Sequence, residues 1–183
     1  IEPGTEGVSI DPEETFKALP SFYRGERVFQ VPVAAKLVFP EVDPEKLAAP
    51  NELASFTTSF DSTNTNRTAN LRRAASALDG VVVGPGQEFS FNGVVGPRDI
   101  STGYKEAMVI LQNVFTPGIG GGVCQVSSTL YNACLLADLK ITERHNHSIT
   151  VPYVPPGMDA TVAYKTRDFR FLNNTGGPVV IKT

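Results

Sequence analysis

The chain has 183 residues, which is enough to bury the core of one domain with a smaller appendage. Hydrophobic residues make up 41% and charged residues 19%, a balance typical of a folded globular protein rather than a disordered one. The net charge of -3, without a basic stripe, excludes the electrostatic footprint of a nucleic-acid-binding protein. No apolar run approaches the roughly 20 residues of a membrane span. Because the chain begins at Ile1 rather than Met, we expect a fragment of a longer protein.

The first 50 residues are rich in Pro and Glu and contain short apolar alternations. Alternation predicts strands over 28–33 and 35–39. Asp11 followed by Pro12 is typical of a helix start, with Asp11 as the N-cap. Residues 40–51 are expected to form a linker, so we place a domain boundary near residue 51.

The remainder, residues 51–183, combines helical and strand patterns. Apolar residues recur at helical spacing over 67–78, and Gly80 is well placed to end that helix. A second helix is predicted over 126–139 from the spacing of its apolar residues. Strands are predicted over 81–83, 89–92, 107–111, 148–154, 160–165, 168–172 and 179–182. The expected fold is α+β, a mixed or antiparallel sheet with a central helix that starts at the nucleophile, plus a small N-terminal α+β appendage.

The two cysteines, Cys124 and Cys134, are expected to be free thiols of different kinds. If both lie on one helix, they are separated by about 15 Å along its axis, which is too far for a disulfide. Cys134 lies in the apolar run Ala133–Leu136, which favours a buried structural role.

Cys124 is the candidate nucleophile. It follows three consecutive glycines and stands at the expected helix start, where the helix dipole favours a thiolate. The backbone of Gly121 and Gly122 can approach a substrate closely and direct N–H groups at a developing oxyanion. The alternative is a small buried residue packed behind a glycine turn.

The only two histidines, His145 and His147, follow shortly after the second helix. A cysteine nucleophile needs a base, and histidine is the usual one. We favour His147, because the strand expected from Ser148 onward would hold it in place, with His145 as a second candidate. A zinc site is less consistent with this spacing, so no metal or other cofactor is expected. Asp159, Asp168 and Glu143 are the candidates for the group that orients the base.

Four residues are candidates for substrate contacts: Arg98, Tyr104, Gln125 and Ser127. Arg98 could hold a substrate carboxylate through two hydrogen bonds or pair with a nearby Asp. Ser127 lies in the expected first helical turn, where its hydroxyl is also suited to capping backbone groups.

Several motifs together resemble the VanW domain. The most specific is the run Gly120–Ala133, and the resemblance extends from about residue 55 to the end of the chain. The other matching segments are Phe89–Asn92, Gly96–Arg98, Gly103–Tyr104, His147–Ser148, Tyr153–Gly157, Asp159–Val162, Asp168–Phe169 and Asn173–Asn174. Residues 1–50 resemble, more weakly, the end of the peptidoglycan-binding domain that often precedes VanW domains in bacterial cell-envelope proteins.

The resemblance implies a cysteine L,D-transpeptidase that acts on peptidoglycan stem peptides. Cys124 would attack the third residue's carbonyl in a donor stem and release the terminal D-amino acid. The acyl group would then pass to the side-chain amine of an acceptor stem, giving a 3-3 cross-link. His147 would carry the proton, and the N–H groups of Gly121, Gly122 or Cys124 would hold the oxyanion.

Two alternatives remain open at this point. One is a cysteine peptidase or amidase acting on the same polymer, in which water resolves the acyl-enzyme. The other is a non-catalytic cell-wall-binding domain associated with glycopeptide resistance, in which Cys124 is structural. In each case the expected partner is peptidoglycan, and the expected location is the cell envelope outside the cytoplasm, with a parent protein that is secreted or membrane-anchored.

Overall fold

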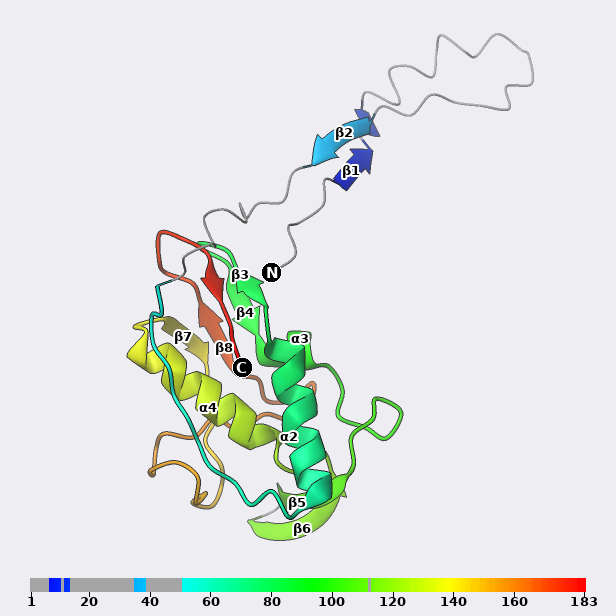
Figure 1. Ribbon diagram of the computed structural model, residues 1–183, viewed down its shortest axis with the longest axis vertical. Helices are drawn as coiled ribbons and strands as arrows, with labels where there is room; N and C mark the ends of the chain where they lie inside the picture. The colour runs from blue at the N-terminus through cyan, green and yellow to red at the C-terminus, as the bar shows by residue number, and fades with distance from the viewer. Residues whose placement is uncertain (1–6, 11, 14–34, 39–50, 112) are drawn as a thin grey trace, which may run out of the picture. The chain divides into compact units, whose positions relative to one another are not determined.

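The computed structural model describes residues 7–10, 12–13, 35–38, 51–111 and 113–183 (Figure 1). The chain divides into two compact units, residues 1–50 and residues 51–183. In the first unit, β1 (Gly7–Ile10) pairs antiparallel with β2 (Ala35–Val38), which falls within the predicted strand 35–39. The predicted strand 28–33, the expected N-cap Asp11 and residues 40–50 of the expected linker lie outside the described residues.

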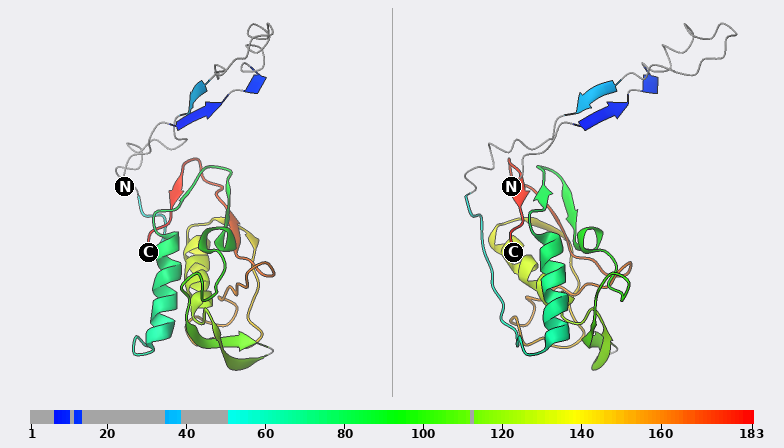
Figure 2. Two further views of the ribbon diagram at one scale, coloured as in Figure 1. Left: turned by 90° about the vertical axis from the view of Figure 1, so that its right-hand side faces the viewer. Right: turned by 45° about the vertical axis from the view of Figure 1, so that its right-hand side comes forward.

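Two long helices form the centre of the second unit. Helix α2 (Thr65–Leu78) begins where the side chain of Asn64 accepts a hydrogen bond from the Arg67 N–H at 3.1 Å. Helix α4 (Val123–Leu136) lies beside α2, as both views in Figure 2 show. The prediction of a helix over 67–78 is confirmed. Helix α4 begins three residues before the predicted start at 126, so Cys124 lies inside its first turn.

Three small antiparallel sheets complete the second unit, and the expected α+β fold is confirmed. One pairs β3 (Val82–Val83) with β9 (Val179–Val180). Another has the order β4 (Glu88–Ser90), β8 (Arg170–Leu172), β7 (Lys140–Glu143). The third is the hairpin of β5 (Glu106–Leu111) and β6 (Val114–Ile119), which lies at the end of the unit where α2 and α4 begin (Figure 1).

The strand predicted over 89–92 ends at Ser90. The Ser90 hydroxyl accepts a hydrogen bond from the Gly93 N–H at 2.9 Å and starts the short helix α3 (Phe91–Val95). An N-cap serine therefore converts the second half of the predicted strand into a helical turn.

Aromatic packing joins the three-stranded sheet to α4. Phe89 and Phe171, which are direct partners across β4 and β8, stack with ring centroids 4.8 Å apart. Phe169 is fully buried and makes a T-shaped contact with Tyr131 of α4, with ring centroids 5.7 Å apart. Because large aromatic side chains contribute much of a small core's burial, this cluster fixes α4 against the sheet.

The strands predicted over 148–154 and 160–165 are wrong. Within those two ranges the structure shows turns and irregular backbone, with a single bridge between Ala163 and Arg167. The Ala160 N–H donates to Ser128 Oγ at 2.9 Å, and its carbonyl accepts from Ser127 Oγ at 2.6 Å. Two hydroxyl groups of α4 therefore satisfy the backbone N–H and carbonyl of Ala160, which in a sheet would pair with a neighbouring strand. No helix in the described part of the chain is long and apolar enough to cross a membrane.

Candidate active site

A three-glycine turn connects β6 to α4. Gly122 occupies the left-handed region at a φ of 106° and stands at the N-cap of the helix. A Cβ atom on Gly121 would lie 2.5 Å from the Met108 carbonyl oxygen and 2.7 Å from that of Ala107. Because the β5 backbone passes this close, only glycine fits at position 121. The turn therefore fixes how α4 leaves the hairpin and where its second residue, Cys124, is held.

Cys124 presents a partly buried thiol. Its sulfur lies 3.6 Å from the Thr161 hydroxyl and 3.5 Å from the Val162 carbonyl oxygen. The side chain of His147 lies close enough to the thiol to lower the pKa of Cys124. As the second residue of a helix, Cys124 lies at the positive end of the helix dipole, which favours a thiolate.

His147 and Asp159 form a tightly coupled pair. The Nδ1 atom of His147 lies 2.5 Å from Asp159 Oδ2, and the backbone N–H of His147 donates to the same oxygen at 2.6 Å. Both residues are buried. Since Nδ1 is engaged with Asp159, Nε2 is the ring nitrogen left to face the thiol of Cys124. The three side chains form a nucleophile–base–carboxylate line.

The pKa shifts of Cys124, His147 and Asp159 each favour the charged form of the side chain. Burial alone would raise the pKa of the Cys124 thiol, but the interactions with His147, Val162 and Thr161 together outweigh it, and the pKa lies below its ordinary value. Burial would lower the pKa of His147, yet its bonds to Cys124 and Asp159 raise it overall. The pKa of Asp159 is lowered, because the N–H groups of His147 outweigh the effect of burial. Both shifts act in favour of a thiolate at Cys124 and an imidazolium at His147.

Arg144 anchors the loop that carries Asp159. It donates to the Asp159 carbonyl at 2.7 Å, to Asp159 Oδ1 at 3.0 Å and to the Gly157 carbonyl at 2.9 Å. Its guanidinium group lies over the ring of Tyr131 at 5.5 Å. The second carboxylate oxygen of Asp159 is thus satisfied by Arg144, which leaves the first for His147.

Helix α4 is joined to the same loop by three polar side chains. The hydroxyls of Ser127 and Ser128 bond the backbone of Ala160, and Asn132 Nδ2 donates to the Met158 carbonyl at 2.7 Å. All three side chains are fully buried. The nucleophile on α4 and the carboxylate at 159 are therefore held at a fixed separation by a buried polar network.

The thiol opens into a cavity of about 1150 Å³. Cys124, His147 and the glycine turn form one part of its wall, and Tyr153 contacts His147 there in an edge-on arrangement, with ring centroids 6.5 Å apart. Among the described residues, the ionisable side chains that line it besides the cysteine, the histidine and the tyrosines are Asp61, Arg67, Arg98 and Arg167. Three cations against one carboxylate suit an anionic substrate.

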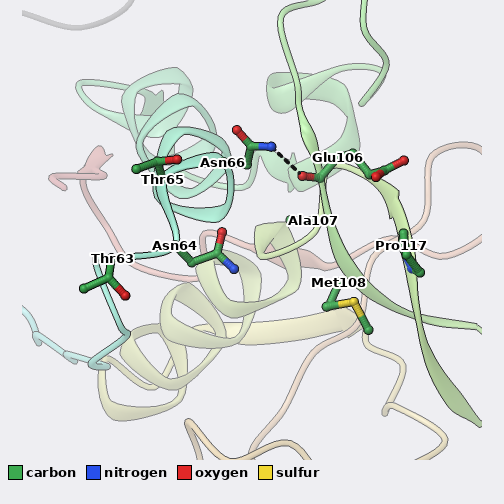
Figure 3. Close-up of a pocket in the computed structure, with 8 residues that line it drawn as sticks. All are labelled: Thr63, Asn64, Thr65, Asn66, Glu106, Ala107, Met108 and Pro117. Carbon is green, nitrogen blue, oxygen red and sulfur yellow. Dashed lines mark hydrogen bonds between the residues drawn. The ribbon is translucent and has the colours of Figure 1, made fainter.

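A smaller hollow of about 430 Å³ lies where α2 begins beside the β5–β6 hairpin. Figure 3 shows the side chain of Asn66 reaching across to the Glu106 carbonyl, to which it donates at 3.0 Å. Met108 lines both this hollow and the large cavity. The hydrogen bond between Asn66 and Glu106 joins the hairpin to α2 and so supports one wall of the large cavity.

Some predicted site residues lie away from the thiol. His145 Nε2 pairs with Glu143 at 3.0 Å on the partly exposed side of the loop. Asp168 accepts from Ser90 Oγ at 2.6 Å and from the Asn92 N–H at 2.9 Å, and it also pairs with Arg170. The carboxylates of Glu143 and Asp168 therefore hold other groups, and Asp159 alone of the three candidates contacts His147.

Of the four predicted substrate contacts, two line the cavity and two do not. Arg98 lines the cavity. Gln125 also reaches it, although its amide is occupied by Arg67 at 2.6 Å and Thr58 at 3.0 Å. Tyr104 and Ser127 are buried in the interior and do not line it.

Sequence reasoning missed Thr161, Val162, Tyr153 and Arg144. Val162 acts through its backbone carbonyl, which no sequence pattern reveals. Tyr153 lies within the Tyr153–Gly157 motif, and Arg144 lies just before the histidine pair, so position along the chain was the available signal for both.

The arrangement can perform nucleophilic acyl chemistry. Cys124 supplies the thiolate, His147 can take and return a proton, and Asp159 fixes the imidazole ring. Among the described residues, no backbone acceptor pairs with the N–H groups of Gly121, Gly122 or Cys124. In the part of the chain that the structure describes, no group of three or more His, Cys, Asp or Glu side chains is placed to hold a metal ion.

Comparison with known proteins places this site within a described family. Residues 66–183 match the family described as VanW like protein. The chain is 40% identical over 184 residues to YoaR of Bacillus subtilis, covering 100% of this chain and 61% of that protein. It is 33% identical over 115 residues to the vancomycin B-type resistance protein VanW of Enterococcus faecalis, covering 60% of this chain and 42% of that protein.

The chain thus spans about three fifths and two fifths of these two relatives, respectively. No solved structure matches it. The family match covers the glycine turn, Cys124, His147 and Asp159, and extends over more than half of the chain. The chain therefore belongs to the VanW-like protein family.

Proposed function

We propose that the chain is a cysteine acyltransferase that acts on peptidoglycan stem peptides as an L,D-transpeptidase. The observation that carries this proposal is the line from Cys124 through His147 to Asp159, which opens into a cavity lined by arginines. Membership in the VanW-like family, one of whose members is named for vancomycin resistance, supports a substrate in the bacterial cell wall. For such a substrate we propose a site in the cell envelope, outside the cytoplasm.

The first half-reaction forms a thioester. The Cys124 thiolate attacks the carbonyl carbon of the third stem residue, and the N–H groups of Gly121, Gly122 and Cys124 hold the resulting oxyanion. The tetrahedral intermediate collapses as the bond to the terminal D-amino acid breaks. The imidazolium group of His147 donates its proton to the departing amine. At the end of this step His147 is neutral and Cys124 is acylated.

The second half-reaction transfers the acyl group. Neutral His147 takes a proton from the attacking side-chain amine of an acceptor stem. The new amide bond forms as the thioester breaks, and Cys124 returns as a thiolate facing an imidazolium. The cavity of about 1150 Å³ is large enough for parts of two peptides near the sulfur.

A second candidate function is hydrolysis of the same bond. The cavity that admits an acceptor amine also admits water, and water attacking the thioester would give a carboxylic acid in place of a cross-link. The two activities share Cys124 and the acyl-enzyme and differ only in the group that resolves it.

Incubation with purified disaccharide tetrapeptides separates these functions. For the transpeptidase, mass spectrometry detects dimers and free D-amino acid, and both are lost in Cys124→Ala. Tripeptide without dimers would assign the hydrolase instead. A wild-type protein that binds the substrate and gives no product would contradict both and favour a non-catalytic wall-binding domain.

A further inference from the structure

Arg98 is held in place along one edge of its guanidinium group. Its Nη1 donates to Asn92 Oδ1 at 2.7 Å and to the Gly96 carbonyl at 2.8 Å. Asn92 is itself fixed, because its amide donates to the Arg167 carbonyl at 2.8 Å. The stem of Arg98 passes so close to Gly120 that a Cβ there would lie 2.9 Å from Arg98 Cβ. The fold therefore sets the position of this cation before any ligand arrives.

The opposite edge of the guanidinium group is unpaired. Nη2 is buried and has no hydrogen-bond partner among the described residues, and no described residue accepts from Nε. The N–H groups of Nε and Nη2 point in the same direction and form the fork that binds a carboxylate through two parallel hydrogen bonds. A buried charged donor without an acceptor is costly, so this fork calls for a ligand.

The fork belongs to the nucleophile's cavity. Arg98 lines that cavity together with Cys124 and His147, and its charge interacts with the Cys124 sulfur. Arg98 Cζ lies over the ring of Tyr164, 5.8 Å from the ring centroid. Arg67, a second cation of the cavity, already donates through Nη2 to Gln125. Arg98 is thus a fixed cation of the cavity wall whose buried Nη2 has no partner among the described residues.

We infer that Arg98 binds a carboxylate of the stem peptide through Nε and Nη2 and so selects donor stems that carry this carboxylate as a free acid. The inference rests on the proposed function, and it adds the group that determines donor specificity. A stem peptide offers two positions for such a carboxylate. One is the terminal residue that is released, and the other is an earlier residue of the stem. Amidation of either one removes its charge without changing the scissile bond.

The test measures binding without turnover, in the full chain carrying Cys124→Ala. Synthetic stem tetrapeptides are titrated in four forms, with both carboxylates free, the terminal one amidated, the internal one amidated, or both amidated. Amidation of the recognised carboxylate should weaken binding by about 10- to 100-fold, the range expected for a charge-assisted pair. The position that matters identifies which carboxylate Arg98 holds. Equal affinity for all four forms would overturn the inference.

A matched pair of variants assigns the effect to Arg98. In the same Cys124→Ala chain, Arg98→Gln should abolish the preference for the free acid, whereas Arg167→Gln removes an equal charge from the cavity wall and should preserve it. Arg98→Lys keeps the charge without the fork and should lose most of the preference. A preference that survives in Arg98→Gln would contradict the inference. A changed alkylation rate when Arg98→Gln is placed in the chain with native Cys124 would then assign Arg98 a purely electrostatic role.

The result is independent of catalysis. If wild-type protein forms no product while the free-acid preference depends on Arg98, the proposed reaction fails and the carboxylate site stands. If products form with free and amidated donors at equal efficiency, the carboxylate site fails and the reaction stands. Should Arg98→Gln not fold, Arg98→Lys assigns the effect instead, because loss of the free-acid preference in that variant supports the inference and a full preference contradicts it.

Discussion

The backbone N–H and the ring Nδ1 of His147 both bond one oxygen of Asp159, at 2.6 Å and 2.5 Å. One carboxylate oxygen therefore fixes both the position of the loop and the orientation of the imidazole ring. The other oxygen is held by Arg144 at 3.0 Å. This double attachment leaves Nε2 as the free ring nitrogen of His147 and distinguishes His147 from His145, which pairs with Glu143 instead.

The two histidines should therefore differ sharply under mutation. His147→Gln removes the proton carrier, and we expect acyl transfer to fall by about 10²- to 10⁴-fold. His145→Gln removes only a partly exposed pair with Glu143, which is worth little, so activity should stay within about twofold. Product formation by mass spectrometry measures both. Equal losses in the two variants would contradict the assignment of His147 as the base.

The thiol of Cys124 should titrate below an ordinary cysteine. Because its pKa is lowered, chiefly by the hydrogen bond and charge of His147 working against burial, the thiolate persists to lower pH and is lost only as pH falls through that lowered pKa. The alkylation rate plotted against pH should have its midpoint below about 8.5, the value for a free thiol. In His147→Gln, burial acts unopposed by the imidazolium, and the midpoint should move to higher pH. An unchanged midpoint would contradict the coupling of the two groups.

The second cysteine provides an internal control for this experiment. Cys134 is buried, and burial raises the pKa of its thiol to about 12. In native protein at neutral pH, an alkylating reagent should modify one site, and peptide mapping should find it at Cys124. Cys134 should react only after unfolding. Modification of Cys134 at a comparable rate in folded protein would be inconsistent with this packing.

Asp159→Asn should affect both activity and acid stability. An amide does not fix the imidazole tautomer as the carboxylate does, so acyl transfer should fall by up to about 10⁴-fold. The pKa of Asp159 is lowered in the folded state, so its charge stabilises the fold above the unfolded pKa of about 3.9 and this contribution is lost as pH falls through the folded pKa.

Thermal unfolding measured across pH checks the stability part of this prediction. The difference in Tm between wild type and Asp159→Asn should be fully present at pH 7 and shrink below pH about 4. A difference that stays constant down to pH 2 would show that the carboxylate charge contributes nothing to stability.

Gly121→Ala should disrupt the turn that carries the nucleophile. The new Cβ would meet the β5 backbone at 2.5 Å, so either the hairpin or α4 must move, at a cost of at least about 1–3 kcal/mol. Gly86→Ala is the control, because Gly86 has a positive φ of 73° but open space around it. Its cost is backbone strain of about 1–2 kcal/mol, and Gly86 does not line the cavity of the thiol. Cys124 alkylation should slow in Gly121→Ala and not in Gly86→Ala. Equal alkylation rates in the two variants would contradict the positioning role.

Sequence patterns predicted the parts of the fold that local chemistry controls. Helix α2 has a regular apolar face, and the glycine run marks the start of α4 beside Cys124. The choice among Asp159, Asp168 and Glu143 could not be made, because it depends on the irregular segment between His147 and Asp159. That segment is shaped by side-chain hydroxyls of α4, which pair with Ala160 across more than 30 positions of the chain.

Two strands of the second unit escaped prediction for local reasons. β6 contains Pro117 and Gly118, which are depleted in strands and interrupt its pattern. β7 has only four residues and alternates between exposed and half-buried positions. Tyr104 and Ser127 resembled substrate contacts because they lie in the motifs shared with the family, yet the structure uses them in its interior. A motif therefore marks residues that matter to the fold as well as to the site.

The most direct test of the account is the mass of the intact protein after rapid quenching with a donor tetrapeptide. We predict a covalent adduct equal to the donor minus its terminal D-amino acid, mapped to Cys124, absent in Cys124→Ala and discharged when an acceptor amine is added. The contrary result is cross-link formation at the wild-type rate by Cys124→Ala with no adduct at any time, which would show that Cys124 is not the nucleophile.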